Sequence, residues 1–255
     1  MDFYQEMMSR NWAFISPEQQ EKIKNTKILL AGCGLGSNIG VLAAQTGFTK
    51  FVVVDHDVVE ISNLNRQAFD RRHLGQNKAL ALKKILEEKS TVVEVEAYPI
   101  RITLDNAEEF VSKTDVVVNT VDFNETVYTI NDIARKQTKP VFFPMNMGWG
   151  GFCLIFTSKS ATLEEILHER IINDNARFIA KLISRLEKFT LPNYLASRLG
   201  QLSTILNSKE KSMPQLAIAS VHSASIVVES ITKHVRDVPL MVAPQPIAID
   251  LQEWR

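Results

Sequence analysis

The 255-residue sequence lacks several features that would place it in a specialised class of protein. It has only two cysteines, Cys33 and Cys153, too few for a disulfide framework and without a Cys-x-x-Cys pair for a structural zinc ion. The N-terminal residues contain no apolar core of signal-peptide length, and no apolar run approaches the ~20 residues of a membrane span. We therefore expect a cytoplasmic protein that does not insert into membranes and holds no structural zinc.

An excess of charge of either sign is also missing, because 29 basic side chains balance 29 acidic ones. A neutral chain has no bulk attraction for nucleic acid or anionic lipid, so a nucleic-acid partner is not expected. The hydrophobic fraction of 45% and the charged fraction of 23% are those of an ordinary globular protein and exclude wholesale disorder. A chain of this length can bury a full-sized core.

The order of apolar and polar segments predicts a doubly wound α/β fold. Short buried strands are expected at residues 27–31, 51–55, 92–98, 115–121 and 140–143. Helices are expected between them, at residues 38–45, 76–89 and 125–136. Buried strands that alternate with helices are typical of a Rossmann-like sheet with helices on both faces.

The segment from Ala161 to Lys211 interrupts this alternation. Its apolar residues recur at helical spacing, which predicts an inserted helical subdomain of long amphipathic helices, broken at Pro192. Pro214 then opens a helix whose stripe of small residues permits close packing against a neighbour. Residues 246–251 are expected to form a late edge strand.

The turn after the first strand, Gly32-Cys-Gly-Leu-Gly-Ser37, predicts a phosphate-binding loop. Glycine lets backbone N–H groups approach a phosphate, and the N-terminus of the following helix adds a favourable partial charge. Asp55 ends the second strand at the place where a ribose hydroxyl would lie. These features alone fit NAD, FAD or ATP equally, although Gly32, Gly34 and Gly36 lack the spacing of the dinucleotide fingerprint.

Charged and amide side chains follow Asp55 in the run Asp-His-Asp-Val-Val-Glu-Ile-Ser-Asn-Leu-Asn-Arg-Gln, with Lys78 beyond it. A dehydrogenase has little use for Arg66 and Lys78 at this point, whereas an enzyme that binds a triphosphate and offsets charge at its α-phosphate needs them. Asp122 follows the buried strand predicted at residues 115–121, where a carboxylate can hold Mg²⁺ beside phosphates. Together these elements predict ATP and Mg²⁺ as ligands.

In these motifs the chain resembles the ThiF/MoeB superfamily, which includes the ubiquitin-activating enzymes and their bacterial relatives. The resemblance rests on Ser62-Asn-Leu-Asn-Arg-Gln67, on the position of Lys78 and on the strand that ends at Asp122, and it covers about residues 10–155 and, more loosely, 213–235. It implies that a carboxylate attacks the α-phosphate of ATP, giving an acyl-adenylate and pyrophosphate. The carboxylate would be the C-terminus of a small ubiquitin-like protein or a peptide.

The resemblance also implies roles for single residues. Asp55 would bind the ribose, and Asp122 would hold Mg²⁺. Arg10 corresponds to an arginine that relatives reach across a homodimer to the partner's γ-phosphate, so a homodimer is implied. The implied catalytic set is Arg10, Arg66, Lys78 and Asp122. The implied nucleotide-binding set is Gly32, Gly34, Gly36, Asp55, Asp57, Asn63, Arg66, Gln67 and Lys78.

The sequence departs from the family pattern in the glycine loop, where Ala31 and Cys33 replace two glycines, and in the N-terminal arm, where Ala13 replaces a second arginine. We expect Cys33 to be a small buried residue. Cys153 lies between Phe and Leu in a predicted strand, which favours a core position over a thioester-forming nucleophile. The acyl-adenylate would then be the final product or pass to a bound nucleophile.

We divide the chain into an N-terminal helical arm (1–25), a nucleotide-binding adenylation domain (26–160), a helical insert (161–212) that selects the substrate, and a C-terminal helix and strand (213–255) that complete the main domain.

Other functions of the chain stay open. The same chemistry could act on a tRNA nucleoside or on a side-chain carboxylate of a precursor peptide. The chain could also be a non-catalytic nucleotide-sensing subunit that binds another protein, or an NAD-dependent oxidoreductase.

Overall fold

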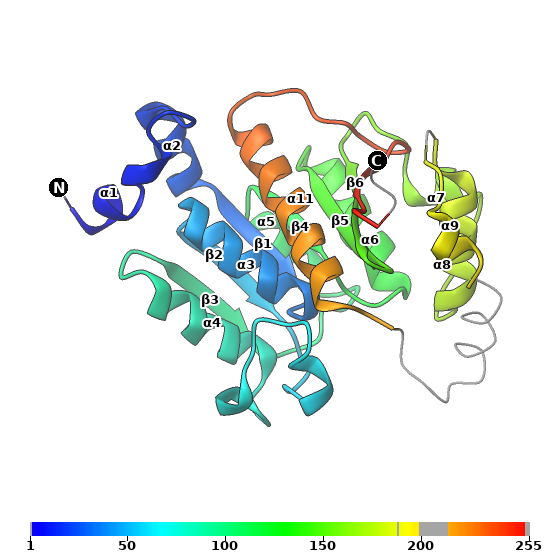
Figure 1. Ribbon diagram of the computed structural model, residues 1–255, viewed down its shortest axis with the longest axis horizontal. Coiled ribbons are helices and arrows are strands. Elements are labelled where there is room, and N and C mark those ends of the chain that lie inside the picture. The colour runs from blue at the N-terminus through cyan, green and yellow to red at the C-terminus, as the bar shows by residue number, and fades with distance from the viewer. Residues whose placement is uncertain (1, 188, 199–213, 253–255) are drawn as a thin grey trace.

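A seven-stranded sheet in the order β3-β2-β1-β4-β5-β6-β7 forms the centre of the molecule in the computed structural model, which describes residues 2–187, 189–198 and 214–252 (Figure 1). The strands are β1 (Lys27–Ala31), β2 (Lys50–Val54), β3 (Glu94–Tyr98), β4 (Val116–Asn119), β5 (Val141–Met147), β6 (Gly150–Phe156) and β7 (Ile247–Ile249). β1 to β5 pair in parallel, while β6 and β7 pair antiparallel. The chain order reverses between β1 and β4, and in such sheets ligands bind at that point.

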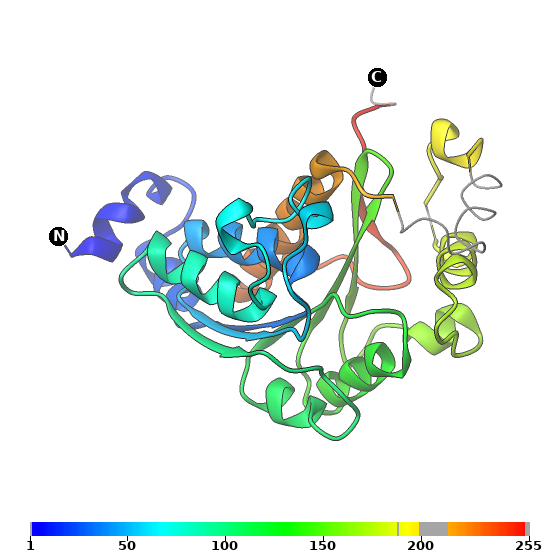
Figure 2. The ribbon, with the colours of Figure 1, turned by 90° about the horizontal axis from the view of Figure 1, so that it is seen from below.

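Helices cover both faces of the sheet, as Figure 2 shows edge-on. One face carries α2 (Pro17–Asn25), α3 (Gly34–Thr46), α4 (Lys78–Lys89) and α11 (Ala217–Val235). The other carries α5 (Ala107–Ser112), α6 (Glu125–Lys136), α7 (Leu163–Leu167) and α8 (Asn175–Arg185). Because side chains alternate along a strand, Ile28 and Leu30 pack into the first core and Leu29 and Ala31 into the second. The expected doubly wound α/β fold is confirmed.

Two local expectations are wrong. The strand predicted at 140–143 continues to Met147, because it forms a long antiparallel hairpin with β6 in which Val141 pairs with Phe156 and Met147 with Gly150. In the described part of the segment after Ala161, the predicted long helices are instead the short helices α7, α8 and α9 (Asn193–Ala196), while residues 199–213 lie outside the described residues. His168 ends α7 in the left-handed conformation, and a second left-handed residue precedes α8, so the chain turns where the apolar spacing predicts a continuous helix.

The N-terminal arm packs against the end of α3 that lies away from the strands' carboxyl ends. It contains α1 (Phe3–Met7), a 3-10 turn at Ser9–Asn11, and α2, which begins at Pro17 after the N-cap Ser16. The Tyr4 hydroxyl donates a hydrogen bond to the carbonyl oxygen of Gly47, the C-cap of α3, at 2.8 Å. This contact anchors the arm at the C-terminal end of α3.

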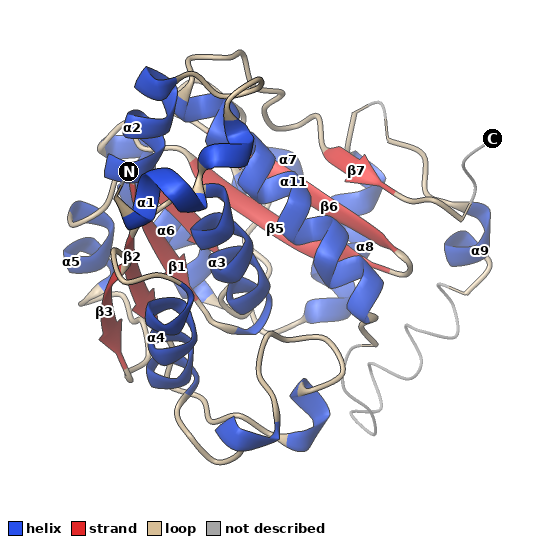
Figure 3. Cartoon of the chain, turned by 60° about the vertical axis from the view of Figure 1, so that its left-hand side comes forward, coloured by secondary structure: helices blue, strands red, loops and turns tan. Residues whose placement is uncertain are grey.

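α11 lies across β5 and β6, as Figure 3 shows, and glycine permits this close approach. A Cβ added to Gly151 would overlap the backbone nitrogen of Ser223 and lie 2.5 Å from the carbonyl carbon of His222. The small-residue stripe predicted for this helix therefore packs against β6. Within the described residues, no helix is long and apolar enough to cross a bilayer.

Gly151→Ala is expected to lower the free energy of unfolding by about 3 kcal/mol, because neither backbone can move without disturbing the core. Urea unfolding measures the change. Gly36→Ala is the matched control: its added Cβ would meet the nearest atom at an ordinary 3.6 Å, so we expect a change of less than about 1 kcal/mol. Equal stability of Gly151→Ala and the wild type would contradict the packing described.

Candidate nucleotide site

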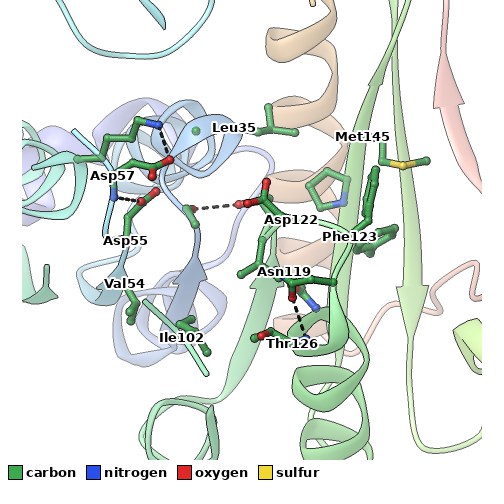
Figure 4. A pocket seen from close by; sticks show the side chains of 18 of the residues that line it. Leu35, Val54, Asp55, Asp57, Ile102, Asn119, Asp122, Phe123, Thr126 and Met145 are labelled. Carbon is green, nitrogen blue, oxygen red and sulfur yellow. Dashed lines mark hydrogen bonds and ion pairs between the residues drawn. The ribbon is translucent and has the colours of Figure 1, made fainter. Parts of the chain in front are cut away.

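A cavity of about 370 Å³ opens at the carboxyl ends of β1, β2 and β4, where the strand order reverses (Figure 4). Most of the side chains and glycines singled out in the sequence line it, although they come from separate segments of the chain. These residues are Gly32, Gly34, Asp55, Asp57, Arg66, Gln67, Lys78 and Asp122. Gly36, Asn63 and Arg10 are not among its lining residues.

The glycine turn needs its first glycine for steric reasons. Gly32 has a φ of 93°, and an added Cβ would lie 2.7 Å from the carbonyl oxygen of Thr120 on the neighbouring strand end. α3 then begins at Gly34, and its N-terminus carries free N–H groups and a partial positive charge at the cavity. Gly36 instead faces the sheet, since its added Cβ would meet Leu30 and Thr120.

Asp55 is a buried carboxylate held by the backbone. It follows β2, its side chain is 8% exposed, and its two oxygens accept hydrogen bonds from the N–H groups of Cys33 at 2.6 Å and Asp57 at 2.8 Å. Burial raises the pKa of Asp55, and these bonds offset only part of that effect. Each oxygen keeps a lone pair, so the carboxylate can still accept a hydrogen bond from a ligand hydroxyl.

Lys78 is placed where the local helix electrostatics disfavour a cation. It is the first residue of α4, after the N-cap Asn77, and so it meets the positive end of the helix dipole. Its ammonium group is nearly buried and lies 3.1 Å from a carboxylate oxygen of Asp57, whose side chain is half exposed. A nearly buried ammonium group that is paired with Asp57 at this point can bind an anion in the cavity.

Arg66 is oriented by three acceptors. Its Nη1 donates to the carbonyl oxygen of Ser62 at 2.7 Å and to the side chain of Asn65 at 2.8 Å, and its Nε donates to Gln215 at 3.0 Å. Desolvation lowers the pKa of Arg66, but an arginine guanidinium stays charged in proteins. Its other terminal nitrogen, Nη2, has no partner among the described residues, which leaves it available to a ligand.

Asn63 has a local structural task. It is 7% exposed, and its side-chain oxygen accepts a hydrogen bond from the N–H of Glu60 at 3.0 Å, closing the 3-10 turn Ile61–Asn63. The same turn fixes the start of the segment that carries Arg66. A direct contact between Asn63 and a triphosphate therefore stays a prediction.

Asp122 stands across the cavity from Asp55 and Asp57, as Figure 4 shows. Its exposed carboxylate has no side-chain partner within the described part of the chain. Mg²⁺ bound with nucleotides is usually held by one or two carboxylates together with phosphate oxygens and water. Asp122 fits this role better than Asp55 and Asp57, whose oxygens accept backbone N–H groups or pair with Lys78.

The sequence analysis missed one part of the cavity. It extends from Asp122 toward β5, α6 and α8, where apolar and uncharged polar side chains share the wall. The residues on this side include Asn119, Phe123, Phe143, Met145, Ile179 and Gln215. Asn119 and Phe123 flank the predicted strand end and could have been found from it, whereas the sequence gives no sign that Ile179 and Gln215 reach the site.

Arg10 lies far from the cavity of its own chain. It is exposed on the N-terminal arm, which is anchored at the C-terminal end of α3, while the cavity meets the N-terminal end of that helix. A helix of 13 residues is about 20 Å long. Arg10 therefore does not line the cavity of its own chain, and a contact with the nucleotide of a second copy stays a prediction.

Both cysteines are fully buried and reduced. Burial raises the pKa of the Cys33 and Cys153 thiols, so neither forms a thiolate at neutral pH. We predict that a thiol reagent such as dithionitrobenzoate titrates no cysteine in the native protein and both after unfolding in guanidinium. One thiol that reacts at once in the native protein would contradict this and reopen a covalent role for it.

Residues 8–235 match the model of the ThiF family. A sulfur carrier protein adenylyltransferase from Thermus thermophilus is 35% identical over 144 residues, which are 56% of this chain and 53% of that protein. The adenylyltransferase and sulfurtransferase MOCS3 from Dictyostelium discoideum is 32% identical over 134 residues, 52% of this chain and 32% of that protein. The chain thus spans about half, or less, of the length of these curated relatives.

Solved structures with a similar fold include E. coli MccB with AMPCPP and MccA and a structure of PaaA. The MccB structure has a TM-score of 0.71 and 20% identity and covers 98% of this chain and 69% of that one. The PaaA structure has a TM-score of 0.68 and 21% identity, with coverage of 93% and 64%. At these identities the likeness establishes the fold alone.

Proposed function

The chain belongs to the ThiF family, and from this premise we propose that it is an ATP- and Mg²⁺-dependent adenylyltransferase. It activates a carboxylate as an acyl-adenylate and releases pyrophosphate. The substrate is the C-terminus of a small ubiquitin-like protein or a peptide. The names of the curated relatives, among them a sulfur carrier protein adenylyltransferase, support this substrate class.

One observation carries the proposal. A helix N-terminus, a buried acid, two cations and a carboxylate with no side-chain partner among the described residues surround one cavity at the switch point of the sheet. An NAD-dependent oxidoreductase requires the first two features, but it has no use for Arg66, Lys78 and Asp122 around the same space. A nucleoside triphosphate uses all of them.

Each side chain has a task in this reaction. Asp55 accepts a hydrogen bond from a ribose hydroxyl, and the N-terminus of α3 binds phosphate oxygens. Arg66 offsets the negative charge that grows at the α-phosphate as the carboxylate oxygen attacks, and Lys78 offsets the charge on the β- and γ-phosphates as their bond to the α-phosphate breaks. Mg²⁺, held by Asp122, would supply further neutralisation of the departing pyrophosphate.

The attacking carboxylate approaches from the part of the cavity that borders β5. Asn146 and Met147 line this side, next to the hairpin turn at Gly148 and Trp149. The apolar wall formed by Phe123 and Ile179 gives room for the last residues of a peptide. Since Ile179 belongs to α8, this placement supports a role for the insert in the choice of substrate.

Thermal unfolding with added nucleotides tests the proposal. A ligand that binds only the folded state raises its stability, and at ATP concentrations ~100 times Kd we expect Tm to rise by about 5 °C or more. Excess EDTA should remove most of this rise, and NADH should have no effect. Stabilisation by NADH that ATP cannot displace would instead assign the site to an oxidoreductase.

We also propose a homodimer in which Arg10 completes the partner's site. Arg10→Ala and Asp122→Ala proteins should each be inactive in ATP–pyrophosphate exchange with a peptide carboxylate. Mixing them in equal amounts under exchange conditions should restore about a quarter of the sites, because half of the dimers are mixed and each holds one intact site. The absence of any recovery, with mixed dimers detected by mass, would exclude shared sites.

A further inference from the structure

A chain of side-chain hydrogen bonds connects Arg66 to the beginning of α11. Arg66 Nε donates to Gln215 Oε1 at 3.0 Å, and Asn146 Nδ2 donates to the same oxygen at 3.2 Å. Asn146 is itself held by Ser220 at 2.7 Å and by Ser223 at 2.9 Å, both on α11. Arg66, Asn146 and Gln215 all line the cavity, so these bonds form part of its wall.

The bonds fix the orientation of both amides. Arg66 Nε can only donate, so the Gln215 atom that it meets must be the amide oxygen. Asn146 meets that oxygen too and must present its nitrogen, which leaves its own oxygen for the Ser223 hydroxyl. Gln215 thus presents an amide oxygen, held in place by Asn146, to the Nε of Arg66.

Gln215 is also held through its backbone. Its carbonyl oxygen accepts a hydrogen bond from Asn65 Nδ2 at 3.3 Å, and Asn65 contacts Nη1 of Arg66. The segment before α11 and the turn that carries Arg66 therefore hold each other in place. Among the described residues, these contacts leave only Nη2 of the guanidinium without a partner.

We propose that Gln215 is a positioning residue for ATP: it fixes the Arg66 guanidinium so that Nη2 faces the triphosphate. The inference rests on the proposed function, because it assigns Gln215 to the same ATP site. Without Gln215, the guanidinium keeps its acceptors at Nη1 but loses the contact that sets the rotation of its plane. Binding of ATP then has to order the side chain and becomes weaker.

A double-mutant cycle on ATP·Mg²⁺ binding, measured by calorimetry, tests this role. Gln215→Met keeps the length of the side chain but removes the acceptor, and it should weaken ATP binding about tenfold. In an Arg66→Met background the same change should have no further effect, because Gln215 acts through Arg66. Gln137→Met, remote from the cavity at the end of α6, is the matched control and should bind ATP as the wild type does.

The outcomes separate the proposals. An equal loss from Gln215→Met in both backgrounds, or no loss in either, would overturn the positioning role while leaving ATP binding intact. A wild-type protein that binds no ATP would overturn the proposed function itself.

The contact between Gln215 and Arg66 is then tested without nucleotide, by the rate of hydrogen exchange at the ¹⁵N-labelled Arg66 Nε–H. Exchange of this hydrogen should be about tenfold slower in the wild type and in Gln215→Glu than in Gln215→Met. Equal exchange rates in the three proteins would refute the contact.

Discussion

Replacing Asp122 by alanine is expected to remove the dependence of ATP binding on Mg²⁺. The carboxylate has no side-chain partner among the described residues and faces the cavity, so its loss should leave the fold intact. Kd for ATP should then be the same with Mg²⁺ and with EDTA. ATP–pyrophosphate exchange should fall by about a thousandfold, because a metal at a reacting phosphate contributes several kcal/mol to transition-state stabilisation.

Two further variants sharpen this test. Asp122→Asn keeps the shape of the side chain but loses its charge, and it should resemble alanine if the role is to hold a cation. Asp105→Ala removes an exposed aspartate outside the cavity lining and should change neither quantity. Mg²⁺-dependent ATP binding that persists in Asp122→Ala would show that another group holds the ion.

Replacing Lys78 by methionine is expected to weaken ATP binding about a hundredfold while changing AMP binding little. The ammonium group is nearly buried, and a charge-assisted bond to a phosphate in such a place contributes about 2–3 kcal/mol. AMP lacks the β- and γ-phosphates that Lys78 should contact. The side chain of Asp57 is half exposed, so water can solvate it once its partner is gone, and stability should change little.

Calorimetric titration with ATP, ADP and AMP measures this difference. Lys84→Met on the same helix is the matched control, since Lys84 is exposed and outside the cavity lining. If Lys78→Met weakens AMP and ATP binding by the same factor, Lys78 contacts the nucleoside or its α-phosphate instead. If it changes neither, the ion pair with Asp57 is only structural.

The sequence predicts the first half of the fold well because local signals and tertiary packing agree there. The strand at 27–31 and the helix at 125–136 have the expected bounds. β5 extends past the expected end at Phe143 because its antiparallel pairing with β6 is a contact between segments, which no single window of sequence contains. The apolar spacing of the insert predicts long helices, yet left-handed residues at His168 and Asn173 divide its described part into shorter ones.

In the site, as in the fold, local sequence signals predict some features, and contacts between distant segments decide the others. Several residues that follow a strand or open a helix line one cavity, because the carboxyl ends of parallel strands meet at one edge of a sheet. Asn63 and Gly36 lie in the expected motifs but face inward, since side-chain direction depends on a turn of one or two residues. Gln215 is separated by 149 positions from Arg66, and only the folded chain brings the two together.

A crystal structure with α,β-methylene ATP and Mg²⁺ tests the central claim most directly, because this analogue cannot transfer its adenylyl group. We predict that the ribose lies against Asp55, that the triphosphate lies between Arg66 and Lys78, and that the metal lies beside Asp122. The α-phosphorus should face the side of the cavity bordered by Asn146. A nucleotide bound elsewhere, or one whose phosphates point away from these side chains, would contradict the proposed adenylation site.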